Sequence, residues 1–376
     1  MIPPRRRAPG RRATLPATLL LTLVLTLLGA LAPSGAGAAS DVPRTNTERF
    51  YAGEPYTGMF ADPAVMRVGG RFYAVATNHD GLNLPLMSST DLRTWRPRAP
   101  LTDYRRWTDW RGYNDALPGR PAWAASIATT SKPQFSQWAP SVARVKGRFV
   151  AAYSAAQTLE TPRRPRRSCI GLAVADRAAG PYVPVSREPT VCYPPSPRGV
   201  IDPDLHVTPD GTAYLLWKQE GVVDRSEPKL MVQRLSADGL RLKAGSRPVE
   251  LLPLVRGTWK GGVIENPSMV RHGGRTYLFY SAHDWYSADY ATGYAECAGP
   301  LGPCVDRTHA RPLLASDGAV KGPGGADAFT DREGRLRLAY AAWDPGRVGP
   351  GGTHARMLHV ARLQRVGGAL RVAERG

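Results

Sequence analysis

The sequence predicts an all-β fold, a five-bladed β-propeller, from three observations. A segment of twelve or thirteen residues recurs five times, with copies that begin at Asp62, Ala139, Asp202, Asn266 and Ala326. A turn glycine follows the first residue of each copy by eight or nine positions, and successive copies begin 77, 63, 64 and 60 residues apart. No long stretch of the repeats has apolar residues at helical spacing.

Each copy has the pattern of a β-hairpin. Short strands with alternating apolar residues flank a turn such as Gly69-Gly70, Lys146-Gly147 or Asp210-Gly211, and such turns are the strongest local signal for a hairpin. A period near 60 residues holds about four strands and their loops, which is one propeller blade. A β-sandwich also contains many short strands, but it predicts no fivefold repeat with a fixed turn offset.

The first 38 residues are predicted to be a signal peptide. Five arginines between Arg5 and Arg12 precede an apolar run from Leu15 to Leu31, and a small-residue cleavage pattern ends at Ala38. A membrane anchor needs about 20 unbroken apolar residues, whereas Pro16 and three threonines interrupt this run. We therefore expect a secreted protein without a membrane partner, with one propeller domain over residues 39–376.

The charge of the chain is strongly basic. It is +19 for the whole sequence and +14 without the five arginines of the signal peptide. Such a balance favours nucleic acid, acidic polysaccharide or an anionic surface as a partner. The arginines are scattered through turns and strands, however, and the one dense cluster, residues 163–167, is typical of an exposed loop. We expect no nucleic-acid partner.

The four cysteines predict disulfides, because an even number in an exported chain is typical of disulfide bonding. Three pairings are possible, of which the local one, Cys169 with Cys192 and Cys297 with Cys304, closes the shortest loops. No Cys-x-x-Cys or Cys/His cluster has the spacing of a zinc site.

Three carboxylates occupy comparable positions in the repeats. Asp62 and Asp202 begin their copies, and Glu265 and Trp138 come directly before the first residues of theirs. Because the innermost strands of a propeller converge on the central channel, we expect these side chains to meet in one cavity. Trp138 is a candidate platform for sugar stacking, since an aromatic ring complements the C–H face of a pyranose or furanose. A single Asp-Pro often caps a turn instead, but equivalent placement of three acids favours a site.

Four motifs and their surroundings resemble glycoside hydrolase family 43, from about Phe60 to Trp343. The motifs are Phe60-Ala61-Asp62-Pro63, Trp138-Ala139-Pro140-Ser141, Val200-Ile201-Asp202-Pro203-Asp204 and Val263-Ile264-Glu265-Asn266-Pro267. The resemblance implies a secreted glycosidase acting on carbohydrate containing arabinose or xylose, as an α-L-arabinofuranosidase, arabinanase or β-xylosidase. It also implies that Asp62 is the general base, Glu265 the general acid, and Asp202 the residue that raises the pKa of that acid. Arg356 resembles a fifth-blade arginine that contacts the acidic centre.

This allocation agrees with inverting hydrolysis. That reaction needs one carboxylate to activate water and one carboxylic acid to protonate the leaving oxygen, with the carboxyl groups about 6.5–9.5 Å apart. Opposite sides of a propeller channel can supply that gap.

The chain departs from the family pattern in two places. Residues 322–325 read Gly-Pro-Gly-Gly where many members have Gly-Pro-Gly-His, whose histidine helps to hold a calcium ion. We expect no required cofactor and no metal ligand at the catalytic site. A structural calcium stays open, since Asp327 could replace the histidine and hard cations prefer carboxylate oxygens. Asn266 also follows Glu265, where a glycine or alanine is common.

Two other functions remain open at this stage. One is a carbohydrate-binding propeller without turnover, and the other is a retaining hydrolase like the sucrose- and fructan-cleaving propellers. Exo or endo action depends on the loops, and we expect the long connection from residue 79 to residue 138 to decide it. A monomer is expected.

Overall fold

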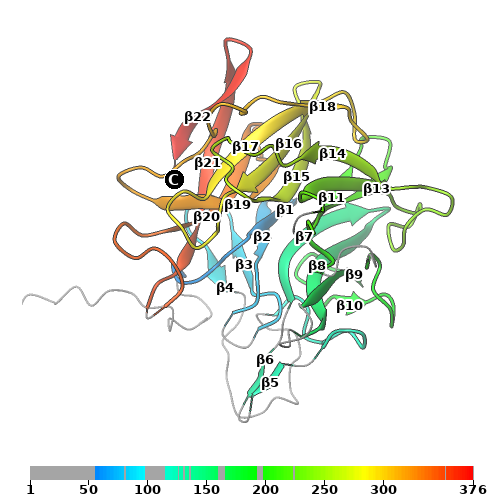
Figure 1. Cartoon of the computed structure of the whole chain (residues 1–376). Coiled ribbons are helices and arrows are strands. Elements are labelled where there is room, and N and C mark those ends of the chain that lie inside the picture. Colours follow the sequence, from blue (N-terminus) through cyan, green and yellow to red (C-terminus); the bar gives the residue numbers. More distant parts are fainter. Residues whose placement is uncertain are drawn as a thin grey trace, which may run out of the picture. The chain divides into compact units, whose positions relative to one another are not determined.

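Five four-stranded antiparallel sheets make up the blades of the molecule (Figure 1). The computed structural model describes residues 56–79, 82–97, 115–125, 137–159, 166–192, 198–222, 225–351 and 353–375, and the backbone alone of residues 127–129 and 132–134. The strands are, for blade 1, β1 (Ala64–Val68), β2 (Arg71–Val75), β3 (Leu86–Ser89) and β4 (Arg96–Pro97); for blade 2, β7 (Gln137–Val145), β8 (Arg148–Thr158), β9 (Arg167–Ala175) and β10 (Val183–Pro184); for blade 3, β11 (Val200–Val207), β12 (Ala213–Gln219), β13 (Lys229–Arg234) and β14 (Val249–Pro253); for blade 4, β15 (Ile264–His272), β16 (Arg275–Ala282), β17 (Ala291–Cys297) and β18 (Cys304–Asp306); for blade 5, β19 (Lys321–Thr330), β20 (Leu336–Trp343), β21 (Arg356–Val366) and β22 (Ala369–Arg375). A small hairpin of β5 (Ile127–Thr129) and β6 (Lys132–Gln134) lies between blades 1 and 2.

The first strands of the five blades close into a ring. Strand β1 contacts β7 and β19, β11 contacts β7 and β15, and β15 contacts β19. The predicted hairpins are the pairs β1–β2, β7–β8, β11–β12, β15–β16 and β19–β20. The predicted all-β five-bladed propeller is therefore confirmed.

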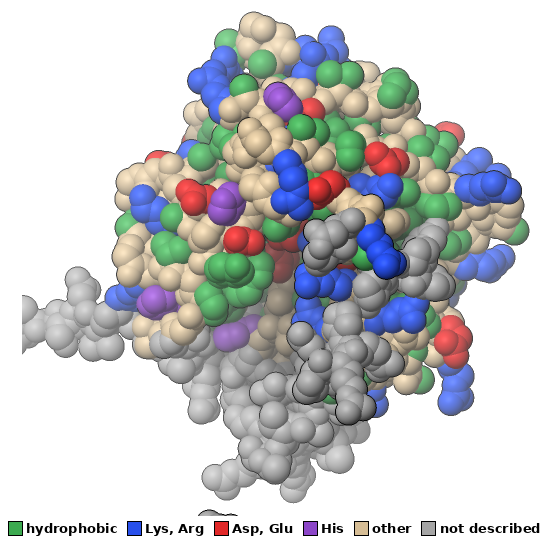
Figure 2. Space-filling model, viewed as in Figure 1, with side chains coloured by type: hydrophobic (Ala, Val, Ile, Leu, Met, Phe, Trp, Pro, Cys, Tyr) green, Lys and Arg blue, Asp and Glu red, His purple; other side chains and the backbone are tan. Residues whose placement is uncertain are grey.

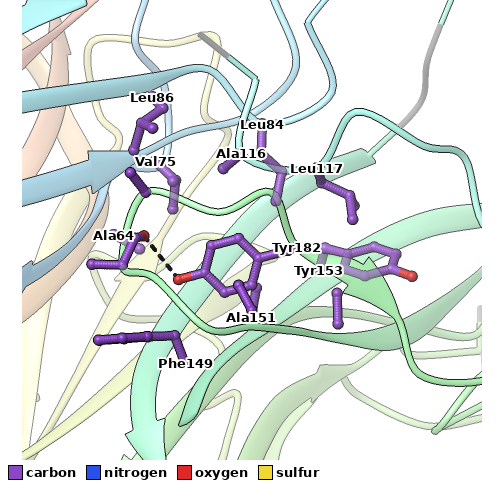
Figure 3. Packing of buried hydrophobic residues seen from close by; sticks show 14 of the residues in the cluster. Ala64, Val75, Leu84, Leu86, Ala116, Leu117, Phe149, Ala151, Tyr153 and Tyr182 are labelled. Atoms are coloured by element: carbon purple, nitrogen blue, oxygen red, sulfur yellow. Dashed lines mark hydrogen bonds between the residues drawn. The ribbon is translucent and has the colours of Figure 1, made fainter. Parts of the chain in front are cut away.

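The core consists of five apolar clusters, one for each interface between neighbouring blades. Successive residues of a strand point to opposite faces, so Leu215 and Trp217 pack toward blade 2 while Leu216 packs toward blade 4. Between blades 1 and 2, the rings of Tyr153 and Tyr182 lie among small and aliphatic side chains (Figure 3). Both faces of each blade are thus buried, so that strands such as β8 and β20 have consecutive buried residues in place of the alternation expected from the sequence.

Each blade is built from consecutive strands, so blades 5 and 1 share no strand. They contact each other through side chains and loops. The Phe60 amide donates to the Arg356 carbonyl at 2.8 Å. Phe72 and Phe329 meet edge to face with their ring centroids 6.0 Å apart. These contacts close the ring between the first and last blades.

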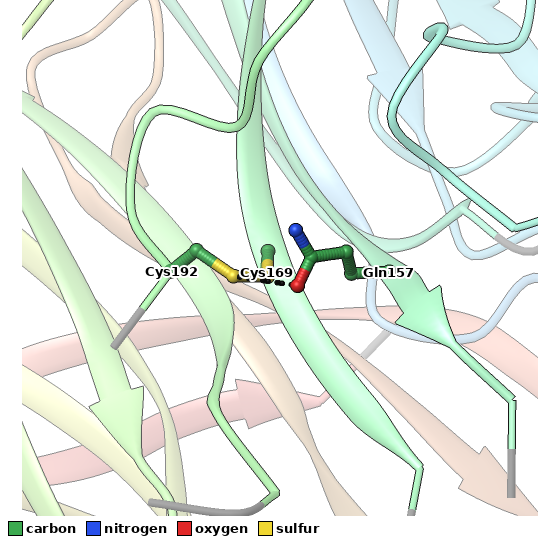
Figure 4. Close-up of a disulfide and its surroundings, with 3 residues drawn as sticks. All are labelled: Gln157, Cys169 and Cys192. Carbon is green, nitrogen blue, oxygen red and sulfur yellow. Dashed lines mark hydrogen bonds between the residues drawn. A yellow bond between two sulfur atoms is a disulfide. The ribbon is translucent and has the colours of Figure 1, made fainter. Parts of the chain in front are cut away.

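Both disulfides follow the local pairing. Cys169 of β9 bonds Cys192 in the loop after β10, beside Gln157 of β8 (Figure 4). Cys297 and Cys304 are cross-strand partners in β17 and β18.

The predicted signal peptide, residues 1–38, lies outside the described residues, as do residues 98–114 of the long connection from residue 79 to residue 138. None of the described residues belongs to a helix long and apolar enough to cross a membrane.

Candidate active site

A bulge at the start of each inner strand aims side chains into the channel. Asp62, Ala139, Asp202 and Asn266 have φ between 46° and 55°, and a proline, which cannot continue the hydrogen-bond ladder, follows each of them. The pairing register shifts at this point in β7, β11, β15 and β19. Bulges of this kind re-aim side chains next to active sites.

Blade 5 has a glycine at the equivalent position. Gly325 has φ 60° and is one residue before Ala326, the first residue of the fifth copy in the sequence repeat. Glycine adopts this conformation without the steric cost that other residues incur.

The bulges surround a cavity of about 1310 Å³. All five predicted site residues, Asp62, Trp138, Asp202, Glu265 and Arg356, line it. The structure therefore brings together every residue that the sequence singled out.

Asp62 is held through both carboxylate oxygens. Its Oδ1 accepts from Arg356 Nη1 at 3.1 Å, and its Oδ2 accepts from the Thr77 hydroxyl at 2.6 Å. Arg356 is 3% exposed and also donates from Nη2 to the Gly324 carbonyl at 3.2 Å. Among the described residues, its buried Nε has no hydrogen-bond partner. The carboxylate of Asp62 is thus fixed in one orientation.

Asp202 is the most enclosed of the three acids. Its residue is 6% exposed, its amide donates to Ser154 Oγ at 2.9 Å, and its Oδ2 accepts from the Asn266 amide at 3.1 Å. Burial raises the pKa of Asp202 well above its usual range, repulsion from Glu265 raises it further, and the charge of Lys218 opposes both. Asp202 therefore keeps a proton at pH values where an exposed aspartate has lost it.

Glu265 is bound by two residues that the sequence reasoning missed. Its Oε1 accepts from the Tyr290 hydroxyl at 2.9 Å, and its Oε2 accepts from Lys218 Nζ at 3.0 Å. Lys218 also pairs with Glu220 at 3.2 Å. Burial disfavours the charge on Lys218, but attraction to Glu265, Glu220 and Asp202 outweighs it and raises the pKa of Lys218. Lys218 is therefore a fixed positive charge between these carboxyl groups.

Sequence periodicity could have revealed some of the missed residues. In blades 1 to 4 one polar residue lies opposite the bulge, namely Thr77 after β2, Ser154 of β8, Lys218 of β12 and Ser281 of β16. Each lies 15 or 16 residues after the first residue of its repeat. A polar residue at a fixed place in a buried strand is a signal for a second layer of contacts around the site.

Trp138 lines the cavity, but an arginine covers part of its ring. The Arg166 guanidinium lies 4.9 Å from the centroid of the Trp138 ring. A guanidinium stacked on an indole is held by cation–π attraction. A sugar that stacks on this same face would have to displace Arg166.

Below the bulges, a second ring of polar side chains joins neighbouring blades. The Ser141 and Ser268 hydroxyls donate to Asp204 and Asp327, both at 3.0 Å. The two aspartates accept in turn from the Met269 and Val65 amides, at 2.8 and 2.7 Å. Their oxygens are thus bound by protein donors from adjacent blades.

This ring does not fit a calcium site built from carboxylates. Both oxygens of Asp327, the residue considered as a replacement for the missing histidine, already accept hydrogen bonds. Within the described part of the chain, no three or more His, Cys, Asp or Glu side chains are grouped so that they could hold a metal ion. The mechanism proposed below therefore uses no metal ion.

The two buried aspartates of this ring predict a pH-dependent stability. Burial, with repulsion from Asp204, raises the pKa of Asp327 to about 7, and burial raises the pKa of Asp204 to about 6. Because both pKa values exceed the usual aspartate value of about 3.9, the folded state binds more protons than the unfolded state above about pH 4. This stabilisation is lost as the pH rises through 7. We expect urea unfolding to give a free energy lower at pH 8 than at pH 5, by an amount on the order of 1–3 kcal/mol.

Asp327→Asn should reduce this pH dependence. Asp331→Asn is the matched control, because its arginine partners hold the pKa of Asp331 at about 2, against the effect of burial, so it does not titrate between pH 5 and pH 8. An equal pH dependence in wild type and Asp327→Asn would contradict the assignment.

The fold and the cavity define a class, a five-bladed β-propeller whose channel mouth carries three interacting carboxyl groups. A family model described as "Glycosyl hydrolases family 43" matches residues 55–366. The chain belongs to this family. The resemblance inferred from the motifs is thereby confirmed.

One curated relative matches part of the chain. It is a protein of Xylanibacter ruminicola named "Putative beta-xylosidase", 26% identical over 203 residues, which are 54% of this chain and 32% of that protein. The chain thus matches about a third of the length of this relative.

Solved structures show the same fold. A thermostable family-43 glycoside hydrolase is 24% identical, with a TM-score of 0.65 over 88% of this chain and 96% of that one. An endo-1,4-beta-xylanase from Bacteroides thetaiotaomicron is 23% identical, with a TM-score of 0.64 over 85% and 97% of the two chains. An exo-1,5-alpha-L-arabinanase from a bovine ruminal metagenomic library is 20% identical, with a TM-score of 0.60 over 87% and 99%.

Proposed function

We propose that this protein is a secreted glycosidase that hydrolyses O-glycosyl bonds with inversion in glycans containing arabinose or xylose. The observation that carries the proposal is the arrangement of Asp62 and Glu265. Asp62 lies just before β1, and Glu265 lies in β15. Their blades are not neighbours in the ring, yet both residues line one cavity. Two carboxyl groups on either side of a glycosidic bond are what hydrolysis by inversion requires.

In this proposal Asp62 is the general base. Arg356 and Thr77 fix its carboxylate, so that it can orient a water molecule and take its proton as the water attacks the anomeric carbon. Arg356, which lines the cavity, is also a substrate-binding residue in this proposal. Glu265 gives a proton to the leaving oxygen as the glycosidic bond breaks, and solvent then restores both groups.

Burial and repulsion from Glu265 raise the pKa of Asp202 well above its usual range, so that a proton is held beside Glu265. Three carboxyl groups, those of Asp202, Glu265 and Glu220, surround the single charge of Lys218. Burial and mutual repulsion make full ionisation of such a group costly. Glu265 is the member of the pair that delivers the proton, because the sugar reaches it from the cavity while Asp202 lies deeper.

Lys218 sets the pH range of this acid. Since its charge lowers the pKa of Asp202, Lys218→Met should let Asp202 keep its proton to higher pH. We expect the alkaline limb of the pH profile of kcat/KM to move upward by about one pH unit or more. Lys229→Met, on the next strand and partly exposed, is the control and should leave the profile in place. An unchanged alkaline limb in Lys218→Met would rule out this role.

The sugar class rests on family membership and on the relatives. Their names include a xylosidase, a xylanase and an arabinanase. Export rests on the pattern of residues 1–38 and on the two disulfides, which persist in oxidising compartments. We also propose that the protein acts as a monomer, needs no cofactor and binds neither nucleic acid nor membrane.

Proton NMR of the first sugar released from an aryl glycoside tests the proposed mechanism. Inversion predicts that the first-formed anomer is opposite to that of the substrate. Retention would indicate a nucleophilic carboxylate about 5–5.5 Å from the acid, as in the sucrose- and fructan-cleaving propellers, and would overturn the role of Asp62 as a base.

A further inference from the structure

Four arginines border the same cavity that holds Asp62 and Glu265. They are Arg166 before β9, Arg198 before β11, Arg225 between β12 and β13, and Arg256 after β14. All four are exposed and come from blades 2 and 3 or from the loops that leave them. Figure 2 shows Lys and Arg side chains along the border of a hollow in which Asp and Glu side chains lie deeper. We call these four residues the arginine rim.

Most of the rim has no carboxylate partner. Arg256 pairs with Glu227 at 2.5 Å. No ion pair to Arg166, Arg198 or Arg225 is present among the described residues. In contrast, Arg356 pairs with Asp62, and Lys218 pairs with both Glu265 and Glu220. Asp284 lines the cavity as well. Among the described residues, the positive charges at the cavity without an ion pair are therefore those of Arg166, Arg198 and Arg225.

One member of the rim is already ordered for binding. Arg166 lies on the ring of Trp138, and a guanidinium stacked in this way keeps the N–H donors at its edge available in the plane of the group. Planar donors of this kind match the two oxygens of a carboxylate. Ordering before binding lowers the entropy that a ligand must overcome.

Aromatic side chains supply the complementary part of the cavity. Trp285 and Tyr286, in the loop between β16 and β17, line it and are 42% and 51% exposed. Trp285 is held by stacking on Trp343, with ring centroids 6.2 Å apart. The part of the Trp285 ring that stays exposed can pack against the apolar face of a sugar.

We propose that the arginine rim binds carboxylate groups of the glycan, so that the preferred substrate carries uronic acid residues close to the bond that is cut. A neutral sugar bound over Asp62 and Glu265 would leave three guanidinium groups unpaired at the mouth, whereas a uronate on a neighbouring sugar would pair with them. The cavity volume of about 1310 Å³ exceeds the usual range of about 300–1,000 Å³ for small-ligand sites and leaves room for more than one sugar. This inference rests on the proposed function, because it takes the glycan to be cut at the floor of the same cavity.

A pair of substrates that differ only in charge tests the proposal. One is a uronic-acid-substituted xylo-oligosaccharide, and the other is the same oligosaccharide after reduction of its carboxyl groups to alcohols. We expect kcat/KM to be at least about tenfold higher for the acidic form, the size of one charge-assisted hydrogen bond. The ratio should fall in Arg198→Gln/Arg225→Gln, a variant that keeps Arg166 and Arg256 in place.

A matched control separates the rim from the general basic charge of the protein. Arg187→Gln/Arg247→Gln removes the same charge from exposed positions outside the cavity and should keep the preference. Equal kcat/KM for the two oligosaccharides in wild type, or a preference lost equally in both double variants, would overturn the proposal.

Binding to Glu265→Gln, measured by calorimetry, distinguishes failure of this inference from failure of the proposed function. If neither oligosaccharide is hydrolysed by wild type but the acidic one binds at least about tenfold more tightly, the rim is supported and the hydrolase is not. If both are hydrolysed and bound equally well, the hydrolase stands and the rim proposal is wrong.

Discussion

Glu265→Gln and Asp62→Asn are each expected to lower kcat/KM by about 10²–10⁴-fold, the contribution of a positioned general acid or base. Both substitutions preserve the size of the side chain while they remove its ability to exchange a proton. Glu265→Gln should lose less with an aryl glycoside whose leaving phenolate is stable, because such a group departs with little protonation. Asp62→Asn should lose the same factor with every leaving group, since activation of water does not depend on it.

The measurement is a series of aryl glycosides of decreasing phenol pKa. Glu188→Gln, which lies on the surface away from the cavity, is the control and should behave as wild type. A loss in Glu265→Gln that does not depend on the leaving group would show that this residue is not the acid.

Gly325→Ala is expected to lower kcat/KM by about 10²-fold, the scale of a displaced catalytic group. A Cβ on Gly325 would lie 2.3 Å from Asp62 Oδ1 and 2.9 Å from Arg356 Nη2, with Asp62 Cα at 3.2 Å. Because part of this contact is with backbone, the pair of Asp62 and Arg356 would have to move. The added methyl would therefore disturb the general base without changing any charge.

Gly334→Ala is the matched control for this variant. Gly334 lies in the β19–β20 turn of the same blade with φ 74°, and a Cβ there would meet nothing within 4 Å. Both variants incur a similar backbone cost of about 1 kcal/mol, so thermal unfolding should shift comparably while kcat/KM falls in Gly325→Ala alone. Equal activity in the two variants would contradict the account of the Asp62–Arg356 pair.

The fold was predictable because each blade repeats its own local signals. A bulge residue, a proline and a glycine turn recur in the sequence, and the structure contains the five hairpins that they predict. The fifth copy of the sequence repeat begins at Ala326, one residue after the bulge residue Gly325. The distance to the turn glycine sets that start, and blade 5, like blade 3, has one more residue between the bulge and the turn.

The site was only partly predictable, since contacts between blades produce no pattern in the local sequence. Asp62, Asp202 and Glu265 could be found because they lie at the start of their repeats, Asp62 and Asp202 as first residues and Glu265 directly before Asn266. Tyr290 could not be found in this way, because it lies in the connection to β17 and reaches Glu265 only through the fold. The stacking of Arg166 on Trp138 could not be predicted either, because Trp138 lies in β7 and Arg166 lies just before β9.

The most direct test of the central claim is turnover by the purified mature protein. The substrates are an aryl α-L-arabinofuranoside, an aryl β-xyloside, linear arabinan and xylan, with Glu265→Gln assayed beside wild type. We expect release of sugar from at least one of the four, and a fall of about a hundredfold or more in the variant. Absence of turnover on all four, or full activity in Glu265→Gln, would contradict the assignment of this cavity as a site that hydrolyses such glycosides.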